Sequence, residues 1–428
     1  MKILLLTHNP ISTNNNMGKT FLALFSEFPE AELCQLYIYP SIPDVEKCGS
    51  YYRITDKDVL RSYLGCPIQG KRIKPNINVD PYRKTVLENE GDLRLYGNPR
   101  NKKPFRMLLR DMMWRFSRWY TKDLQEWLSQ EAPTHIFVAP GPSKFLYDMA
   151  LRISKDRNLP VVTYICDDYY FVKPGKNLLE KCYIHGLREK IDKLLARSTH
   201  LVAICEEIKE SYVQQFSLPA DVIMTGSSWK QNADATRESI QSLSYFGNIR
   251  SGRYRSLAEI GRQLDQINAE RGTNYQLMLY TGEQNEDILS VLAEIGSIKL
   301  CGFVSGGAYT AAFNNAEVLV HVEDFAEDNI DFVKHSVSTK IADSLACGKP
   351  LFAYGPDCVA SMGHLIHNDC AITATFSGEL RNKLEMLFGD KEERARVVAN
   401  AMKTAEKYHD LGRNSKKLHS IFEGIKNE

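Results

Sequence analysis

The clearest signal of the architecture is residues 331–355, which read DFVKHSVSTKIADSLACGKPLFAYG. Ser338 or Thr339 suits the N-cap position of a helix, and the apolar residues after it recur with helical spacing. Gly348 ends that helix, and Pro350 opens a short apolar run of the kind found in buried strands. A loop, a helix and a strand in this order form one repeat of an α/β protein.

The same alternation extends over most of the chain. Short apolar runs bounded by Pro, Gly or charged residues predict a first array of strands at residues 2–7, 32–39, 134–139, 160–165, 200–204 and 221–225. A second array is predicted at residues 244–247, 276–280, 299–304, 318–322 and 350–353. The two arrays predict an α/β protein with two Rossmann-like, doubly wound domains facing across a cleft. Ligands of such sheets bind at the carboxyl ends of the strands.

A polar, helix-poor segment separates the two arrays and sets the expected domains. We expect an N-terminal Rossmann-like domain over residues 1–230, with an irregular insertion over 43–130 that ends in one long helix from residue 104 to residue 130. A C-terminal Rossmann-like domain is expected over residues 240–410. Residues 411–428 are expected to form a helix that packs back toward the N-terminal domain.

Composition excludes several classes of protein. The chain has 428 residues, 43% of them hydrophobic and 25% charged, which excludes a disordered chain, a collagen or a coiled coil. A net charge of +1 gives no overall attraction to nucleic acid. The longest early apolar run, residues 3–6, is too short for a signal peptide or a membrane span, so we expect a cytoplasmic protein. Ten scattered cysteines without a C-x-x-C pair predict buried thiols, and no metal is expected.

The helix start at residues 338–343 combines groups that suit a diphosphate. The N–H groups at a helix start and the helix dipole attract anions, and Lys340 adds a cation beside them. One turn further, the carboxylate of Asp343 can accept hydrogen bonds from both hydroxyls of a ribose. Local spacing leaves an alternative open, in which this is a capped core helix whose Lys340 and Asp343 are solvated.

Residues 331–355 also resemble the donor-binding motif of GT-B glycosyltransferases, especially the family 4-like enzymes of bacterial surface polysaccharide biosynthesis. In that family two acidic residues, separated by seven others, precede apolar residues, Gly and Pro. Asp343 falls on the second acidic position, and residues 346–350 (ACGKP) match the segment after it. His335 falls on the first acidic position, whose residue contacts the donor sugar in the family.

Other residues of the second array fit this resemblance in order and spacing. Arg253 and Arg255 follow the strand and loop that open the family's nucleotide domain, where basic residues contact the diphosphate. Gly302 and Val304 resemble a turn whose backbone reads the edge of the base, and Glu323 ends a strand where such enzymes approach the nucleotide. The resemblance therefore implies donor binding by these residues and by Ser338, Thr339 and Lys340.

The first array carries two further candidate segments. Gly18 lies in NNNMGKT at residues 14–20, where the family packs a glycine-containing loop near the donor phosphate and the acceptor. Cys166 and Asp167 take the positions of a His-Asp pair in the family, and Asp168 follows. Either carboxylate could bind an acceptor hydroxyl or act as a general base. The alternative is that the two aspartates cap the next segment.

Residues 101–120 (NKKPFRMLLRDMMWRFSRWY) form a local concentration of positive charge. Asp111 is the only acid among six basic residues, and apolar residues recur there with helical spacing. A basic helix with interfacial aromatic residues can lie on an anionic membrane. The alternative is an amphipathic helix that packs on the first sheet with its arginines solvated, and the two arrangements can coexist.

The resemblance implies a glycosyltransferase of the hexosyltransferase type. It would move a sugar from a nucleotide-diphosphate sugar, expected to be a UDP-sugar, to a hydroxyl of a glycan or lipid-linked glycan in polysaccharide biosynthesis. We expect no metal, no nucleic acid, and a cytoplasmic location with peripheral contact to the membrane face through residues 101–120. Two alternatives stay open, a UDP-sugar 2-epimerase-like GT-B enzyme and a non-catalytic module that binds nucleotide-sugars.

Overall fold

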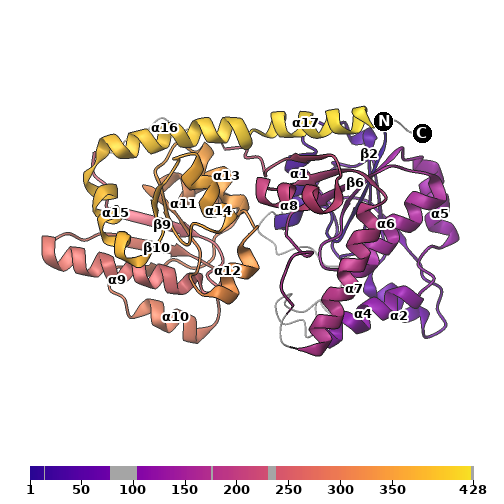
Figure 1. Cartoon of the computed structure of the whole chain (residues 1–428), viewed down its shortest axis with the longest axis horizontal. Helices are drawn as coiled ribbons and strands as arrows, with labels where there is room; N and C mark the ends of the chain where they lie inside the picture. The colour runs from indigo at the N-terminus through magenta and orange to yellow at the C-terminus, as the bar shows by residue number, and fades with distance from the viewer. Residues whose placement is uncertain (14, 78–103, 175–176, 230–237, 426–428) are drawn as a thin grey trace. The chain divides into compact units, whose positions relative to one another are not determined.

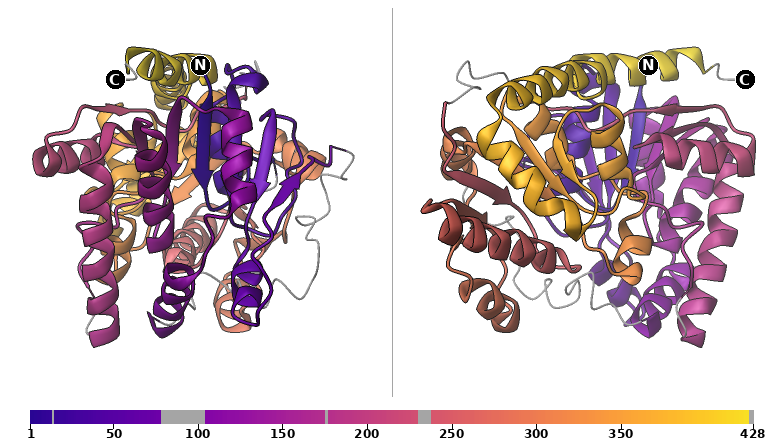
Figure 2. Two further views of the ribbon diagram at one scale, coloured as in Figure 1. Left: turned by 90° about the vertical axis from the view of Figure 1, so that its right-hand side faces the viewer. Right: turned by 60° about the vertical axis from the view of Figure 1, so that its left-hand side comes forward.

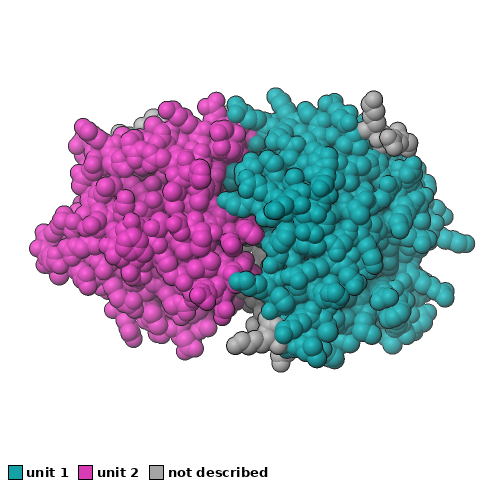
Figure 3. All heavy atoms as spheres, in the orientation of Figure 1, with its two compact units in different colours: residues 1–225, 411–428 teal, residues 226–410 magenta. Residues whose placement is uncertain are grey.

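The computed structural model describes residues 1–13, 15–77, 104–174, 177–229 and 238–425. Parts of the segments named above lie outside the described residues, namely Asn14, residues 78–103 of the expected insertion, and residues 230–237 between the two arrays. By their contacts the residues form two compact units, coloured separately in Figure 3: unit 1 is Met1–Thr225 with Leu411–Glu428, and unit 2 is Gly226–Asp410. Each unit has a mainly parallel sheet with interleaved helices, so the predicted α/β architecture of two Rossmann-like units is confirmed.

The sheet of unit 1 has eight strands in the order β4-β3-β2-β1-β5-β6-β7-β8. Their bounds are β1 Ile3–Thr7, β2 Leu33–Tyr37, β3 Ser50–Arg53, β4 Lys71–Ile73, β5 His135–Ala139, β6 Val161–Ile165, β7 Ser198–Ala203 and β8 Ala220–Val222. Neighbouring strands are parallel except β3 and β4, and the register sets Leu5 of β1 opposite Gln35 and Phe137. The central strands are buried along their whole length because helices cover both faces of the sheet (Figures 1 and 2).

The helices of unit 1 complete this core. Their bounds are α1 Asn16–Leu24, α2 Asp56–Ser62, α4 Pro104–Phe116, α5 Lys122–Glu131, α6 Lys144–Arg157, α7 Leu178–Leu195, α8 Glu206–Phe216 and α17 Leu411–Gly424. Phe21 and Phe25, on and just after α1, meet Phe137 of β5 edge to face. Leu418 and Phe422 of α17 are buried in the same cluster. The last helix of the chain is therefore part of the core of unit 1.

Two expectations for residues 43–130 were wrong. Part of the expected irregular insertion forms strands β3 and β4, which extend the sheet, and Tyr52 of β3 is fully buried. The single helix expected over residues 104–130 is two helices, α4 and α5. Thr121 separates them because its hydroxyl accepts a hydrogen bond from the Leu124 N–H at 3.2 Å and so caps the start of α5.

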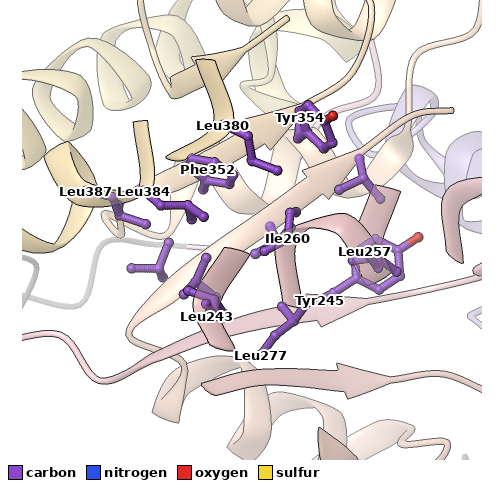
Figure 4. Close-up of a cluster of buried hydrophobic side chains, with 14 of the residues drawn as sticks. Leu243, Tyr245, Leu257, Ile260, Leu277, Phe352, Tyr354, Leu380, Leu384 and Leu387 are labelled. Carbon is purple, nitrogen blue, oxygen red and sulfur yellow. The ribbon is translucent and has the colours of Figure 1, made fainter. Parts of the chain in front are cut away.

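The sheet of unit 2 has six parallel strands in the order β11-β10-β9-β12-β13-β14. Their bounds are β9 Ser242–Phe246, β10 Gln276–Tyr280, β11 Ile298–Leu300, β12 Val318–Val322, β13 Leu351–Tyr354 and β14 Ile372–Ala374. The helices are α9 Arg253–Arg271, α10 Glu286–Ala293, α11 Gly306–Asn315, α12 Glu327–Val333, α13 Thr339–Ala346, α14 Ala360–His367, α15 Ser377–Gly389 and α16 Lys391–Tyr408. Figure 4 shows part of its core, where Leu243 of β9, Leu257 of α9, Phe352 of β13 and Leu384 of α15 are fully buried.

Candidate functional site

The candidate site of unit 2 lies where the strand order changes direction. From β9 the chain runs outward through β10 to β11, and then returns to β12 on the other side of β9. The carboxyl ends of β9 and β12 are thus neighbours at a topological switch point, where ligands bind in open α/β sheets. Gly247 follows β9 directly, and Glu323 follows β12. The loop after β9 leads into α9, whose first residue is Arg253.

Arg253 and Glu323 form a buried ion pair at this point. Nη2 of Arg253 donates to both carboxylate oxygens of Glu323, at 2.9 and 2.8 Å. The side chains are only 17% and 4% exposed, so water screens the attraction weakly. Burial raises the pKa of Glu323, although the positive charge of Arg253 opposes that shift. The sequence singled out both residues, but their pairing across 70 positions was not predictable.

His321, two residues earlier on β12, is a buried neutral group beside the pair. Its Nε2 lies 3.1 Å from Oγ of Ser361 and 3.8 Å from a carboxylate oxygen of Glu323. Burial, with smaller contributions from the positive charges of Arg253 and Lys340, lowers the pKa of His321 to about 3. The imidazole is therefore uncharged at neutral pH. Sequence analysis named Glu323 at the end of this strand but assigned no role to His321 or Ser361.

Lys340 reaches the same edge of the sheet from α13. The backbone of Gly247 has φ +151°, and a Cβ added there would lie 3.3 Å from Nζ of Lys340. Glycine therefore leaves room for the ammonium group beside the end of β9. Ser338 takes the N-cap position of α13, as predicted, and the N–H groups of a first helical turn lack partners within the helix. Arg253, Glu323, Lys340 and the start of α13 are thus brought together.

Asp343 lies one turn into α13 and already accepts a hydrogen bond. Oγ of Ser227 donates to its Oδ1 at 2.6 Å. The backbone N–H of Ser227 also donates to the carbonyl of His409 at 2.8 Å. Ser227 was not predicted, and it joins Asp343 to the two points where the chain enters and leaves unit 2.

Arg255 is held differently from Arg253. It donates from Nε and Nη2 to the two oxygens of Asp324, at 3.0 and 2.5 Å, and its side chain is 50% exposed. Gly252 stands at φ +76°, and a Cβ there would lie 2.2 Å from the Asp324 carboxylate. This glycine therefore lets the carboxylate reach the start of α9. The pairing with Asp324 shows Arg255 supporting that loop, and its contact with the diphosphate remains a prediction.

The remaining predicted donor residues are placed on the same edge by the topology. Gly302 and Val304 follow β11, and Gly302 adopts φ +74°, which favours glycine. His335 lies in the turn between α12 and α13. The Phe303 side chain is 73% exposed and lies beside Gly282, after β10. The reading of the base edge by the turn at Gly302 and Val304, and the contact of His335 with the donor sugar, remain predictions.

In unit 1, Gly18 is constrained by its surroundings. A Cβ at Gly18 would lie 2.7 Å from the backbone nitrogen of Ser12 and 2.9 Å from the carbonyl oxygen of Pro10. Its N–H donates to Oδ1 of Asn15, which caps α1, at 2.6 Å. Glycine at this position therefore permits a tight loop after β1.

The two predicted aspartates after β6 have different surroundings. Oδ1 of Asp168 accepts from the N–H groups of Tyr170 and Phe171, at 2.9 and 3.0 Å, and from the hydroxyl of Tyr212 at 3.1 Å. That arrangement matches the alternative in which the carboxylate holds the loop. Asp167 lies within reach of the Cys166 thiol, at 3.8 Å. Asp167 also shares a hydrogen bond with the Tyr169 hydroxyl, so both carboxylates have partners in this loop, and a catalytic role for either remains a prediction.

A polar cluster at the switch point of unit 1 was missed by sequence analysis. Nη2 of Arg110, on α4, lies 3.0 Å from Nε2 of His8, which directly follows β1. Its Nε donates to Asp56 at 2.8 Å, and its Nη1 donates to Ser143, after β5, at 3.4 Å. A histidine right after a central strand was the available signal, but its arginine partner is 102 residues away.

Among the described residues, no group of three or more His, Cys, Asp or Glu side chains is arranged to hold a metal ion. Within the same part of the chain, no helix combines the length and the hydropathy that crossing a bilayer requires.

The comparisons with known proteins establish the fold. No protein-family model and no curated protein sequence matches the chain. Among solved structures, the HepE protein of Anabaena in complex with UDP and glucose has a TM-score of 0.63 and 12% identity, over 99% of this chain and 100% of that one. Sucrose-phosphate synthase of Thermosynechococcus elongatus has a TM-score of 0.62 and 10% identity, over 99% and 98%.

A third neighbour has the same architecture. The UDP-forming α,α-trehalose-phosphate synthase of Burkholderia xenovorans, in complex with glucose-6-phosphate, has a TM-score of 0.61 and 10% identity, over 99% of this chain and 100% of that one. Because these similarities span whole chains, they include both Rossmann-like units. The chain therefore has the two-domain fold of the GT-B glycosyltransferases.

Proposed function

We propose that the protein is a glycosyltransferase that moves a sugar from a UDP-sugar to a hydroxyl group of a glycan or lipid-linked glycan. The observation that carries the proposal is the gathering of Arg253, Lys340 and the start of α13 at the switch point of unit 2. Two cations and a helix start at one sheet edge suit a diphosphate. Neighbours of the same fold include a protein solved with UDP, with UDP and glucose, and with UDP-glucose.

On the donor side, these groups would stabilise the leaving diphosphate. As the bond between the sugar and the diphosphate breaks, negative charge grows on the phosphate oxygens, and fixed cations there lower the barrier. Glu323 holds the guanidinium of Arg253 in place at 2.8 Å, so that it is already oriented before a ligand binds. His321 is neutral at this point and adds no repulsion toward either cation.

The other donor contacts follow from the position of each residue. Asp343 would accept from the ribose hydroxyls, in exchange for or together with its bond from Ser227. The backbone at Gly302 and Val304 would read the base edge, and His335 would lie toward the sugar. In unit 1, the loop at Gly18 would pack near the phosphate.

On the acceptor side, Asp167 is the candidate base. A carboxylate at the carboxyl end of β6 can accept the proton of an acceptor hydroxyl as that oxygen attacks the anomeric carbon. Asp168 would orient the loop that carries it, since its Oδ1 accepts three hydrogen bonds there. The sugar carbon gains oxocarbenium character in such a step. We place the protein in the cytoplasm and its product in polysaccharide biosynthesis.

A nucleotide-release screen tests the proposal. Purified protein is incubated with UDP-, GDP- or dTDP-sugars, with and without a lipid-linked acceptor, and both the released nucleotide and the sugar products are measured. We expect UDP release that rises with acceptor and falls sharply in Lys340→Met. The matched control is Arg262→Met, which removes an exposed cation of α9 outside the site. Failure of every donor to release nucleotide, or an epimerised sugar as the product, would refute glycosyl transfer.

A further inference from the structure

The outward face of α4 is apolar and exposed. Phe105, Leu109, Met112 and Phe116 are 57%, 49%, 53% and 67% exposed. Their spacing is four, three and four residues, which places all four within roughly 60° of the helix circumference. We name these four residues the α4 stripe. Sequence analysis expected this apolar face to lie on an anionic membrane or to pack on the sheet, and the structure turns it away from the protein.

The opposite face of α4 fixes this orientation. Trp114 is fully buried, stacks on Phe145 with ring centroids 4.4 Å apart, and donates from Nε1 to Asp56 at 2.6 Å. Arg110 pairs with the same Asp56 at 2.8 Å. A rotation that buried the α4 stripe would expose the indole ring and break both bonds. The stripe is therefore an outer surface of unit 1.

Positive charge borders the α4 stripe on both sides. Arg106 and Arg115 are exposed and lie on opposite sides of it around the helix, and Arg118 is exposed just beyond the helix end. Asp111, the only acid of α4, points inward, 3.8 Å from the ammonium of Lys144. The solvent-facing charges of this helix are therefore cationic.

The helices that neighbour α4 also carry exposed apolar side chains. α4 packs between α2 and α7, and Figure 1 shows the three helices together. At the end of α2, Tyr63 is 51% exposed, Leu64 is 81% exposed, and the Tyr63 hydroxyl donates to the carbonyl of Met113 at 2.6 Å. Leu178, at the start of α7, is 73% exposed. Both helices that pack against α4 thus carry exposed apolar side chains at one end.

We infer that the α4 stripe and its arginines dock on an anionic phospholipid surface. An apolar row bordered by cations fits the boundary between headgroups and acyl chains, where each arginine adds attraction to negative lipids. A second copy of the chain fits less well. A two-fold interface through the stripe would set Arg106 and Arg115 of one copy against those of the other.

Docking would bring the switch point of unit 1 close to the lipid. The inward face of the same helix carries Arg110 to His8, at the end of β1. One helix diameter, roughly 10–12 Å, would separate the membrane from that carboxyl edge. This consequence rests on the proposed function, in which a lipid-linked acceptor enters at unit 1. The docking itself does not depend on the transfer reaction.

Vesicle sedimentation of the full chain tests the docking without donor or acceptor. One set of vesicles contains phosphatidylcholine and phosphatidylglycerol in equal parts, and the other contains phosphatidylcholine alone. We expect binding to the anionic set that weakens at high salt, because salt screens the arginines. Leu109→Gln/Phe116→Gln should lower partitioning more than tenfold. Arg106→Gln/Arg115→Gln should lower it roughly thirtyfold, at about fivefold per arginine.

Controls distinguish binding through the α4 stripe from nonspecific adsorption to vesicles. Phe376→Gln removes a 54% exposed phenylalanine of unit 2 and should leave partitioning unchanged. Thermal melts check that each variant is folded. The inference is overturned if wild type does not bind anionic vesicles, if the stripe variants bind as wild type does, or if light scattering shows a dimer that the stripe variants dissociate.

Discussion

Replacing Arg253 with methionine should separate the structural and the binding roles of the buried ion pair. The arginine ends 2.8 Å from Glu323, whose side chain is 4% exposed. Methionine fills most of the same volume and leaves the carboxylate buried without its cation. Removal of one partner from a buried pair costs about 3–5 kcal/mol, and the 17% exposure of Arg253 favours the lower end. We expect the free energy of unfolding to fall by about 3 kcal/mol at pH 7.

The loss should depend on pH with a defined sign. Burial already raises the pKa of Glu323, and without Arg253 the main opposing charge is gone. The folded variant then takes up a proton at a higher pH than the unfolded chain does. Stability relative to wild type should therefore recover as the pH falls from 7 to 5. Urea unfolding followed by circular dichroism at both pH values measures this recovery.

A second substitution distinguishes stability from ligand binding. In Arg253→Met/Glu323→Gln both charges are gone, so most of the lost stability should return. Affinity for UDP should nevertheless stay about thirtyfold weaker, because a charge-assisted hydrogen bond to the diphosphate is worth about 2 kcal/mol. Calorimetric titration with UDP measures it, with Arg262→Met as the control. Wild-type affinity in the double variant would refute the role of Arg253, and unchanged unfolding of the single variant would refute the buried pair.

Three further predictions follow from other contacts. Asp343→Asn keeps an acceptor for Ser227 but loses the negative charge, so UDP should bind about tenfold more weakly by calorimetry. An unchanged Kd would refute the proposed contact between Asp343 and the ribose. Gly18→Ala sets a Cβ 2.7 Å from a backbone nitrogen and should lower the free energy of unfolding by about 1–3 kcal/mol. Gly389→Ala is the control, because the space around Gly389 is open and its free energy of unfolding should not fall. Equal urea midpoints for the two variants would contradict this prediction. His321, with its pKa lowered to about 3, stays neutral in the fold while the unfolded chain takes up a proton below about pH 6.5. Acid should therefore cost stability, by at most about 1.4 kcal/mol per pH unit from this group, and His321→Asn should flatten the slope of unfolding free energy against pH.

The sequence predicted the sheets well wherever strands were apolar throughout. Buried parallel strands such as β1 and β5 leave a continuous hydrophobic run that is easy to recognise. β3 was missed because Ser50–Arg53 is short and polar at both ends, and its burial depends on contacts with β2. The break between α4 and α5 was missed because the hydrophobic pattern continues across it. Only the hydroxyl of Thr121 marks the new helix start.

The sequence singled out several residues that meet at the candidate site of unit 2, but not the bonds between them. Arg253, Glu323 and Lys340 were each expected near the donor, and the parallel sheet brings them to one edge. The pairing of Arg253 with Glu323 depends on the strand order, which places β9 beside β12. Ser227 bonds Asp343 across 116 residues, and local spacing carries no information about such contacts.

The switch point of each unit holds a largely buried arginine that is paired with a carboxylate near a histidine. Arg253 in unit 2 is 17% exposed and paired with Glu323, near His321, while Arg110 in unit 1 is 16% exposed and paired with Asp56, near His8. A bare buried guanidinium would cost several kcal/mol of desolvation, and a carboxylate partner offsets that cost while the site is empty.

The carboxylate also orients the guanidinium, so a ligand does not have to order it. An incoming anion must then compete with a carboxylate that carries a single negative charge. In the proposed function, a diphosphate, which carries more than one negative charge, would compete for the arginine better than a monovalent anion. The paired arginine would then favour highly charged anions over monovalent ones, and His321, neutral at these pH values, would leave that preference unchanged across the neutral pH range.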